Sequence, residues 1–180
     1  MSNTSQFVLA GFGGQGILFA GKLIATAGLI EERELSWLPS YGPEMRGGTA
    51  NCNVTLSDEP IGCPIVDTPN GLIAMNQPSF DKFVDTVVPG GVIVCDTTLI
   101  NNVRTRDNVR TIEIPATTLA EENGLKGLAN VVCLGKLFAE TQFCSEETLY
   151  AAVERCVPAR KAHLIEPNKK ALKLGMEYQG

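Results

Sequence analysis

A glycine-rich stretch between two apolar runs places the tightest limit on how this chain can fold. The stretch is Gly11-Phe12-Gly13-Gly14-Gln15-Gly16, and it fits the pattern Gly-x-Gly-x-x-Gly. The run 6–10 before it is typical of a short buried strand, and the run 17–30 after it predicts a helix. In that setting Gly11 permits a tight turn, Gly13 lets the backbone approach a phosphate, and Gly16 lets the helix pack close to the strand.

The start of the following helix would offer unpaired amides and a partial positive charge to an anion. One feature of an NAD site is missing, namely a carboxylate about 20 positions later, at the end of the second strand. That strand ends in Leu38-Pro39-Ser40, and Glu34 lies at its beginning. Three interpretations therefore stay open: an ordinary dinucleotide site, an anion or nucleotide site of another kind, and close packing of a strand against a helix.

Strands and helices alternate through the first two thirds of the sequence, and helices follow in the last third. This order predicts an α/β fold, Rossmann-like, with a largely parallel sheet covered by helices on both faces and a helical C-terminal third. No repeat, charge block or long linker divides the 180 residues, so we expect a single domain over 1–180. The expected strands are 6–10, 34–38 (ended by Pro39), 49–57, 71–75, 91–95 and 109–114, and the expected helices are 17–30, 79–87 (capped by Ser79), 118–123, 128–143, 146–157 (capped by Ser145) and 168–177.

Composition and charge argue against several classes of function. The chain has 15 Lys and Arg against 20 Asp and Glu, a net charge of -5, and only 6% aromatic residues, which disfavours nucleic-acid binding. The longest apolar stretch, 17–30, is interrupted by Lys22 and is shorter than the roughly 18 residues that a membrane span needs. The polar start, 1–6, does not resemble a signal peptide. We expect a soluble cytoplasmic protein that binds neither membrane nor nucleic acid.

The cysteines and the single histidine do not suggest a metal or redox centre. None of the six cysteines is paired at Cys-x-x-Cys spacing, which zinc knuckles and iron-sulfur clusters commonly use. Cys95 and Cys133 lie within apolar runs, where a free cysteine behaves as a small buried hydrophobe. His163 has no Ser or Cys nucleophile near it in sequence. We expect structural thiols, a surface or capping histidine, and no catalytic or metal-binding residue in this chain.

The segment that joins the second and third expected strands is unusually constrained. It reads Ser40-Tyr41-Gly42-Pro43-Glu44-Met45-Arg46-Gly47-Gly48. In open parallel sheets, ligands bind at the edge where such connections leave the strands. The guanidinium of Arg46 suits a phosphate, a carboxylate or an acidic side chain of a partner, although an internal pair with Glu44 or Asp67 is the alternative.

Together these two segments resemble the gamma subunit, or the corresponding domain, of 2-oxoacid:ferredoxin oxidoreductases. The resemblance is carried by Gly11-Phe12-Gly13-Gly14-Gln15-Gly16 and Tyr41-Gly42-Pro43-Glu44-x-Arg46-Gly47-Gly48, and further by Ile114-Pro115-Ala116-Thr117 and Ala129-Asn130-x-x-x-Leu134-Gly135. The longer block 38–52, with Ala74-Met75-Asn76-Gln77-Pro78, is most similar to the 2-oxoglutarate synthase branch. The single domain would then be a gamma-type pyruvate/ketoisovalerate oxidoreductase catalytic domain.

The resemblance implies a complex of anaerobic metabolism. In this family thiamine diphosphate decarboxylates a 2-oxoacid, iron-sulfur clusters pass electrons to ferredoxin, and coenzyme A (CoA) takes the acyl group. This sequence has no Gly-Asp-Gly followed by a distant Asn-Asn, because Asn101-Asn102 stands alone, and no cluster ligands. Thiamine diphosphate, Mg and the clusters are therefore expected on alpha, beta and delta-type partner subunits, and the isolated chain is expected to be inactive.

CoA is the one cofactor that this chain could itself contact. The residues expected to bind it are Gly11, Gly13, Gly14, Gln15, Gly16, Tyr41 and Arg46. We also expect an apolar face of the 17–30 helix or of the 128–143 helix at a subunit boundary, with a homodimer as one form of contact. Two other hypotheses remain: a free-standing Rossmann-type dinucleotide-binding oxidoreductase, and a binding module without a catalytic role.

Overall fold

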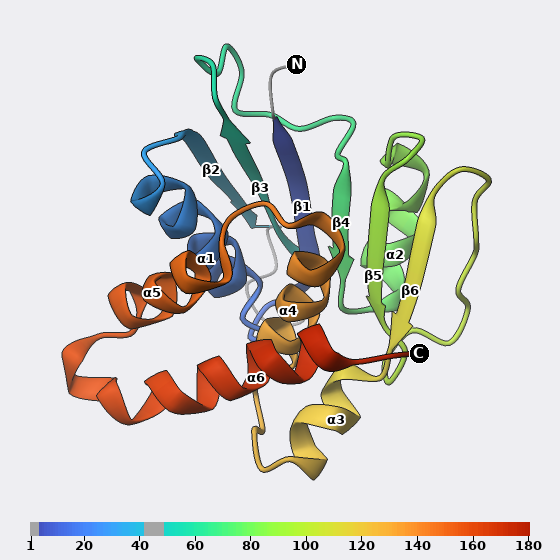
Figure 1. Ribbon diagram of the computed structural model, residues 1–180. Coiled ribbons are helices and arrows are strands. Elements are labelled where there is room, and N and C mark those ends of the chain that lie inside the picture. The colour runs from blue at the N-terminus through green and yellow to red at the C-terminus, as the bar shows by residue number, and fades with distance from the viewer. Residues whose placement is uncertain (1–3, 42–48) are drawn as a thin grey trace.

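The computed structural model of the protein describes residues 4–41 and 49–180. The sheet of this described part consists of β1 (Ser5–Phe12), β2 (Glu34–Tyr41), β3 (Thr49–Ser57), β4 (Gly71–Ala74), β5 (Val92–Asp96) and β6 (Arg110–Ile114). These strands lie in the order β2-β3-β1-β4-β5-β6 (Figure 1). The pairs β1–β4, β4–β5 and β5–β6 are parallel, whereas β3 is antiparallel to both β1 and β2. The expected mostly parallel sheet is confirmed, with β3 running against the other described strands.

Helices cover the two faces of the sheet unequally. One face carries α1 (Ile17–Ile30), α4 (Ala129–Thr141), α5 (Glu146–Cys156) and α6 (Ile165–Glu177), with α3 (Ala116–Glu122) beside α4 and the 3-10 turn η2 (Ala159–Leu164) before α6 (Figure 1). The other face carries α2 (Gln77–Phe83) and the 3-10 turn η1 (Val84–Thr86). The hydrophobic cluster under α2 contains residues of β1, β4 and β5 but none of β2 or β3. Within 4–41 and 49–180, no helix is both long and apolar enough to cross a membrane.

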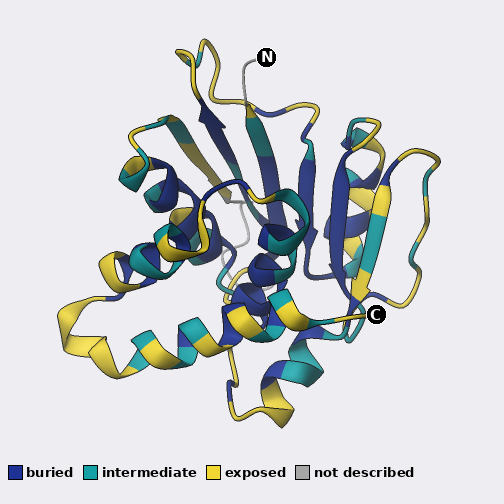
Figure 2. Cartoon of the chain, viewed as in Figure 1, coloured by how far each residue is buried: buried dark blue, intermediate teal, exposed yellow. Residues whose placement is uncertain are grey.

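The central position of β1 explains its continuous apolar sequence. Phe7 and Leu9 point into the core under α1 and α4, whereas Val8 and Ala10 point into the core under α2. All four side chains are buried, and this part of the sheet is dark blue in Figure 2. A strand covered on both faces needs such a run, so the expected strand is confirmed and extends to Phe12.

Most elements begin and end near the expected positions. Two residues that were expected to mark the ends of elements, Pro39 and Ser79, do not do so. Pro39 does not end the second strand, because β2 continues to Tyr41. β2 is an edge strand, where a residue without a backbone N–H can be tolerated on the open side. Ser79 is not the cap of α2: the Oδ1 of Asn76 accepts a hydrogen bond from the Ser79 backbone N–H at 2.8 Å. Ser145 does cap α5, as expected, by accepting from the Thr148 N–H at 3.1 Å.

The two helices expected to reach a subunit boundary differ in exposure. The apolar residues of α4 lie in the main core, between the sheet and α6, so α4 has no free apolar face. On α1, Leu29 is 51% exposed and Leu18 and Phe19 are partly exposed. Of the two candidates, only α1 keeps apolar side chains available to a partner.

Two glycines allow α4 and α6 to cross at close range. A Cβ added to Gly135 would clash with the backbone carbonyl of Leu172, and one added to Gly175 would clash with that of Val132. Neither clash can be relieved by moving a flexible side chain, because the opposing atoms belong to helix backbones. The crossing therefore requires glycine at both positions.

Five of the six cysteines are buried, and Cys63 is exposed. Burial raises the pKa of the Cys52, Cys95 and Cys144 thiols to about 12, and it raises the pKa of Cys133 well above its usual value. For Cys52 this effect outweighs the hydrogen bond with Trp37, which acts in the opposite direction. These four groups therefore stay protonated at neutral pH and behave as apolar core side chains.

We predict that Gly175→Ala lowers the free energy of unfolding by about 1 to 3 kcal/mol, because a methyl group forces the α4 and α6 backbones apart. Gly62→Ala is the matched control, since a Cβ at Gly62 has no atom within 4 Å. Urea denaturation of both variants measures the difference. Equal stability of the two would contradict the close crossing.

We predict that one thiol reagent adduct forms quickly in the folded chain at about pH 8, and that it lies on Cys63. The five buried thiols should react only after denaturation, because burial keeps the reagent away from them. For Cys52, Cys95, Cys133 and Cys144 the raised pKa also leaves almost no thiolate at this pH. Peptide mass spectrometry identifies the labelled residue, and Cys63→Ser should abolish fast labelling. Fast labelling of Cys52 or Cys133 in the folded chain would show that the core is wrongly described.

Candidate functional site

The ends of β1, β2 and β3 meet at one edge of the sheet because β3 is antiparallel to both neighbours. Gly11 of β1 lies opposite Ala50 of β3, and Ala50 lies opposite Tyr41 of β2. Tyr41 and Thr49, which flank residues 42–48, therefore lie next to the glycine turn. Arg46 itself, like the rest of 42–48, lies outside the described residues, so its expected role stays a prediction.

The glycine turn is held by the side chain of Gln15. Its Oε1 accepts a hydrogen bond from the Phe12 N–H at 2.6 Å, and its Nε2 donates to the Met75 carbonyl at 3.0 Å. The side chain thus closes the turn and ties it to the end of β4. These two bonds fix the orientation of the Gln15 amide, so its side chain supports the turn from within.

The conformational demand for glycine falls on Gly14 and Gly16, whose φ angles are 95° and 73°. A Cβ on Gly14 would meet no atom within 4 Å, so this part of the turn is open to an approaching group. A Cβ on Gly16 would lie 2.5 Å from the Nδ2 of Asn130. Gly11 is not in the turn but in β1, where the missing side chain leaves room for Gln15 and Ile17. The positions that need left-handed backbone are therefore Gly14 and Gly16, whereas Gly11, expected to permit the tight turn, belongs to the strand.

Two helices begin at this edge without a capping side chain. Gly16 precedes α1 and Leu128 precedes α4, and neither helix has an acidic residue in its first turn. The Nδ2 of Asn130 donates to the Gly16 carbonyl at 2.9 Å and so links the two starts. Unpaired amides and the positive ends of two helix dipoles favour an anion at this position.

Two cavities of about 280 Å³ each flank the glycine turn. One is lined by Gly14, Leu99, Lys126 and the acidic Glu121, among others, and the second by Gly13, Phe12 and Leu18, among others. Leu99 and Phe12 are 41% and 37% exposed, so apolar surface borders the polar turn. The edge can therefore hold a group that combines an anion with an apolar body.

Three lysines near this edge have no partner. Lys22, Lys126 and Lys161 are exposed, and their side chains make no ion pair, hydrogen bond or ring contact with the described residues. Each of the other lysines of the chain has one: Lys82 stacks on Phe83, Lys170 bonds the Asn123 carbonyl, and Lys136, Lys169 and Lys173 pair with glutamates. The unpaired lysines line the cavities around the glycine turn and the start of α4. Sequence reasoning missed Lys126 because only the fold brings it beside Gly14.

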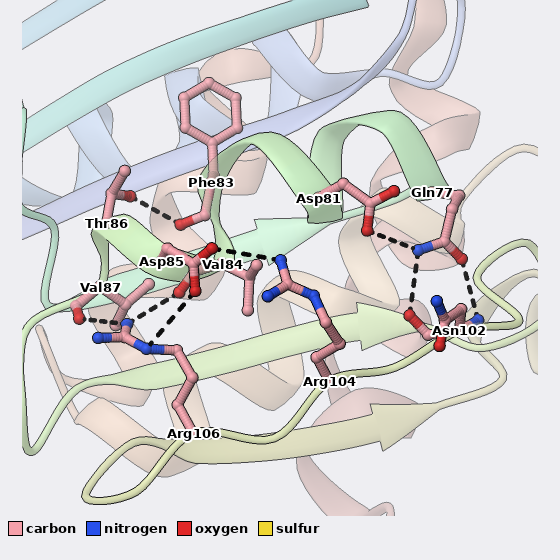
Figure 3. Close-up of polar contacts among 10 residues, drawn as sticks. All are labelled: Gln77, Asp81, Phe83, Val84, Asp85, Thr86, Val87, Asn102, Arg104 and Arg106. Atoms are coloured by element: carbon pink, nitrogen blue, oxygen red, sulfur yellow. Dashed lines mark hydrogen bonds and ion pairs between the residues drawn. The ribbon is translucent and has the colours of Figure 1, made fainter.

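The loop between β5 and β6 carries Leu99 and so borders the first of the two cavities beside the glycine turn. Hydrogen bonds attach this loop to α2 and to the segment that includes η1 (Figure 3). Gln77 Oε1 accepts from the N–H groups of Asn101 and Asn102, and Arg106 donates to the carbonyls of Val84 and Val87 at 2.9 and 2.7 Å. Asn101 and Asn102 therefore serve to anchor the loop that carries Leu99.

Of the described acidic side chains, Glu34 lies away from the glycine turn, Asp96 is engaged in hydrogen bonds, and the exposed Glu121 lines the cavity beside Gly14. Glu34 begins β2 opposite Ser57, at the far edge of the sheet from the glycine turn. Asp96, at the end of β5, is fully buried and accepts from Thr117 Oγ1 at 2.6 Å and from the Thr98 N–H. Within 4–41 and 49–180, no group of three His, Cys, Asp or Glu residues could hold a metal ion, and His163 is exposed on η2.

Comparison with known proteins gives relatives of two kinds. The ketoisovalerate oxidoreductase subunit VorA of Methanothermobacter thermautotrophicus is 41% identical over 170 residues, which cover 94% of this chain and 35% of that protein. The 2-oxoglutarate synthase subunit KorC of Methanocaldococcus jannaschii is 39% identical over 153 residues, which cover 83% of this chain and 82% of that protein. The chain thus spans about a third of the VorA relative and most of the KorC relative.

Solved structures share the fold. The gamma subunit of a keto/oxoacid ferredoxin oxidoreductase from Geobacter sulfurreducens matches with a TM-score of 0.82 at 30% identity, over 96% of both chains. A 2-oxoglutarate:ferredoxin oxidoreductase from Magnetococcus marinus, with 2-oxoglutarate, CoA and succinyl-CoA bound, matches with a TM-score of 0.84 at 26% identity, over 96% of this chain and 30% of that chain.

The family assignment rests on nearly the whole length of the sequence. The profile of the family described as pyruvate ferredoxin/flavodoxin oxidoreductase matches residues 6–178. It includes the glycine turn, the edge of the sheet and the helices that begin there. The chain therefore belongs to the pyruvate ferredoxin/flavodoxin oxidoreductase family.

Proposed function

We propose that the chain is the gamma subunit of a complex that oxidatively decarboxylates a 2-oxoacid to its acyl-CoA and reduces ferredoxin. The proposal is supported by the match over nearly all of the Geobacter sulfurreducens gamma subunit and most of the KorC relative. Within the chain, it is carried by the edge around the glycine turn, where two uncapped helices and unpaired lysines favour an anionic ligand. These residues can bind and orient an anionic ligand.

The redox and decarboxylation chemistry belongs to partner subunits in this proposal. The buried cysteines and the absence of a ligand cluster within the described residues do not fit an iron-sulfur site. The sequence also lacks the paired motifs for thiamine diphosphate and Mg. Alpha, beta and delta-type subunits would therefore carry these groups and pass electrons to ferredoxin. The exposed Leu29 and the partly exposed Leu18 and Phe19 of α1 would form one contact surface for them.

The 2-oxoacid is proposed to be 2-oxoglutarate, and a branched 2-oxoacid is the second candidate. The KorC relative is named as a 2-oxoglutarate synthase subunit, and this chain covers 82% of it. The VorA relative, named as a ketoisovalerate oxidoreductase subunit, is similarly identical but is covered over only 35% of its length. A free-standing NAD enzyme is not favoured, because Glu34 lies at the start of β2, at the end of the sheet opposite to the glycine turn, where its carboxylate could not reach the ribose of a bound NAD.

The proposed ligand of the glycine turn is a phosphate of CoA. Backbone amides at Gly14 and at the start of α1 would face the phosphate, and Arg46 would reach it from the segment that starts beside the turn. These groups would hold and orient CoA while its thiol is used on a partner subunit. Gly11, Gly13, Gln15, Gly16 and Tyr41 would shape this pocket through the backbone.

We predict that the purified chain has no 2-oxoacid oxidation activity with a viologen dye, because it encodes neither the decarboxylation cofactor site nor an electron path. Addition of the partner subunits should restore turnover, with a higher kcat/KM for 2-oxoglutarate than for 2-ketoisovalerate. Turnover by the chain alone would contradict the subunit assignment. A preference for 2-ketoisovalerate would contradict the substrate alone.

We predict that Arg46→Ala raises the KM for CoA of the assembled complex by roughly tenfold to a hundredfold, the effect of losing a bidentate contact with a phosphate. Arg46→Lys should restore only part of the affinity, because an ammonium cannot form the same paired contact. Arg104→Ala is the control, since among the described residues the Arg104 side chain pairs only with Asp85, on the α2 side. An unchanged KM for CoA in Arg46→Ala, with normal assembly, would disprove the role of Arg46.

A further inference from the structure

A cavity at the opposite end of the sheet from the glycine turn is lined by the one exposed cysteine of the chain, Cys63. It measures about 310 Å³ and lies beside the start of β1 and the end of β3, where Gln6 pairs with Thr55 (Figure 1). The loop between β3 and β4 forms the remaining wall. This volume lies at the lower end of the range of roughly 300 to 1,000 Å³ that small-molecule sites occupy.

The buried hydroxyl of Thr55 gives this lining an unpaired hydrogen-bonding group. Thr55 is 2% exposed, and its Oγ1 has no partner. Its neighbours on β3, Val54 and Leu56, point into the main core, so the Thr55 side chain points away from that core and toward the cavity that it lines. Buried polar groups are rarely left unpaired, and water does not reach this one. A ligand that enters the cavity would supply the missing partner.

Two other polar side chains of the lining are free, and a third is engaged. The Gln6 amide and the Glu59 carboxylate make no hydrogen bond or ion pair with the described residues. Ser57, by contrast, contacts the Thr4 hydroxyl at 3.2 Å and accepts from the Glu59 N–H at 3.1 Å. Gln6, Glu59 and Thr55 therefore each offer the cavity an oxygen that can accept a hydrogen bond.

The charge of the lining favours a cationic ligand. Glu59 is the one charged residue that lines the cavity in the described part of the chain, and its neighbour Asp58 pairs with Arg33 at 3.1 Å outside the lining. A carboxylate without a counter-ion attracts a cation and repels an anion. An ammonium group carries three N–H donors, which matches the three free acceptors.

The loop over the cavity provides both access and a reactive atom. Most residues of 58–65 are exposed, and the described chain forms no helix or strand between β3 and β4. Such a segment shifts at low cost in free energy, which opens a path to Thr55. Cys63 is exposed on this loop, and Ile65 adds apolar surface to the same lining. A group attached to the Cys63 Sγ therefore lies at the cavity, with an apolar side chain beside its carbon atoms.

We propose that Cys63 is a site of reversible modification by small cationic aminothiols, whose ammonium group binds in this cavity. The Cys63 thiolate attacks one sulfur of an aminothiol disulfide. The disulfide bond of the reagent breaks, a mixed disulfide forms on Cys63, and the released aminothiolate takes up the proton that Cys63 lost. The ammonium group then meets Glu59, Gln6 and the buried Thr55 hydroxyl. The adduct protects Cys63 from irreversible oxidation and is removed by exchange with a free thiol.

The test is an equilibrium competition between cysteamine and 2-mercaptoethanol on the full chain. Both reagents have a two-carbon chain, and they differ only in an ammonium group against a hydroxyl. The chain is incubated with equal concentrations of the two thiols and of their disulfides and is then quenched with acid. Peptide mass spectrometry gives the ratio of the two adducts on Cys63, and the same competition in urea gives the ratio without the cavity. Folding should raise the ratio of cysteamine to mercaptoethanol adduct by roughly tenfold, the effect of one charge-assisted hydrogen bond.

Three variants locate the origin of this preference. Glu59→Gln should return the ratio to about that of the unfolded chain. Asp58→Asn is the matched control, because it removes the same charge one position away but outside the lining, and it should keep the preference. Thr55→Val should lower the ratio by roughly threefold. This replacement breaks no hydrogen bond of the folded chain, because the Thr55 Oγ1 has no partner, so the fold should be retained.

Equal adduct ratios in the folded and unfolded chain would overturn the proposal, as would a wild-type ratio in both Glu59→Gln and Thr55→Val. An equal loss of preference in Glu59→Gln and Asp58→Asn would show that the overall negative charge of the chain selects the reagent, and this too would overturn it. The cavity and the glycine turn lie at opposite ends of the sheet, and the competition uses neither CoA nor partner subunits. Its outcome is therefore independent of the proposed function.

Discussion

The antiparallel insertion of β3 between β1 and β2 is the constraint on which the candidate site depends. Because β3 runs against its neighbours, it begins at the edge where β1 and β2 end, with Ala50 between Gly11 and Tyr41. A parallel third strand would have required a crossover to the opposite edge. The pairing therefore brings Tyr41 and Thr49, the described residues on either side of 42–48, close to the glycine turn, although more than 30 residues separate Gly11 from Thr49.

The helices that begin at this edge lack capping and acidic side chains, and this makes the edge favourable for an anion. α5 begins with a capping serine and two glutamates, which neutralise its dipole within the chain. α1 and α4 begin with neither, so their amides and dipoles remain available to an external anion. The unpaired lysines lie around the same helix starts. Although the net charge of the chain is -5, the described residues that line the cavities at this edge include three lysines and one acid, Glu121, which favours a small anionic ligand there.

Local patterns in the sequence predicted the elements well, because their signals are short-range. The apolar run of α1 and the alternation of β3 gave the observed bounds, and Ser145 was found as a cap. Pro39 was misread because whether a strand lies at an edge depends on the topology of the whole sheet. The spacing of glycines located the turn, but the assignment of left-handed conformation to Gly14 and Gly16 needed the backbone. Lys126 could not be found from sequence, because the turn between α3 and α4 that carries it lies beside Gly14 only in the folded chain.

The most direct measurement of the central claim is a structure of the assembled complex with CoA bound. We expect a phosphate of CoA to lie within hydrogen-bonding distance of the backbone at Gly14 or the start of α1, with Arg46 against the same phosphate. A CoA molecule held entirely by other subunits, with this edge facing solvent or buried against protein, would contradict it.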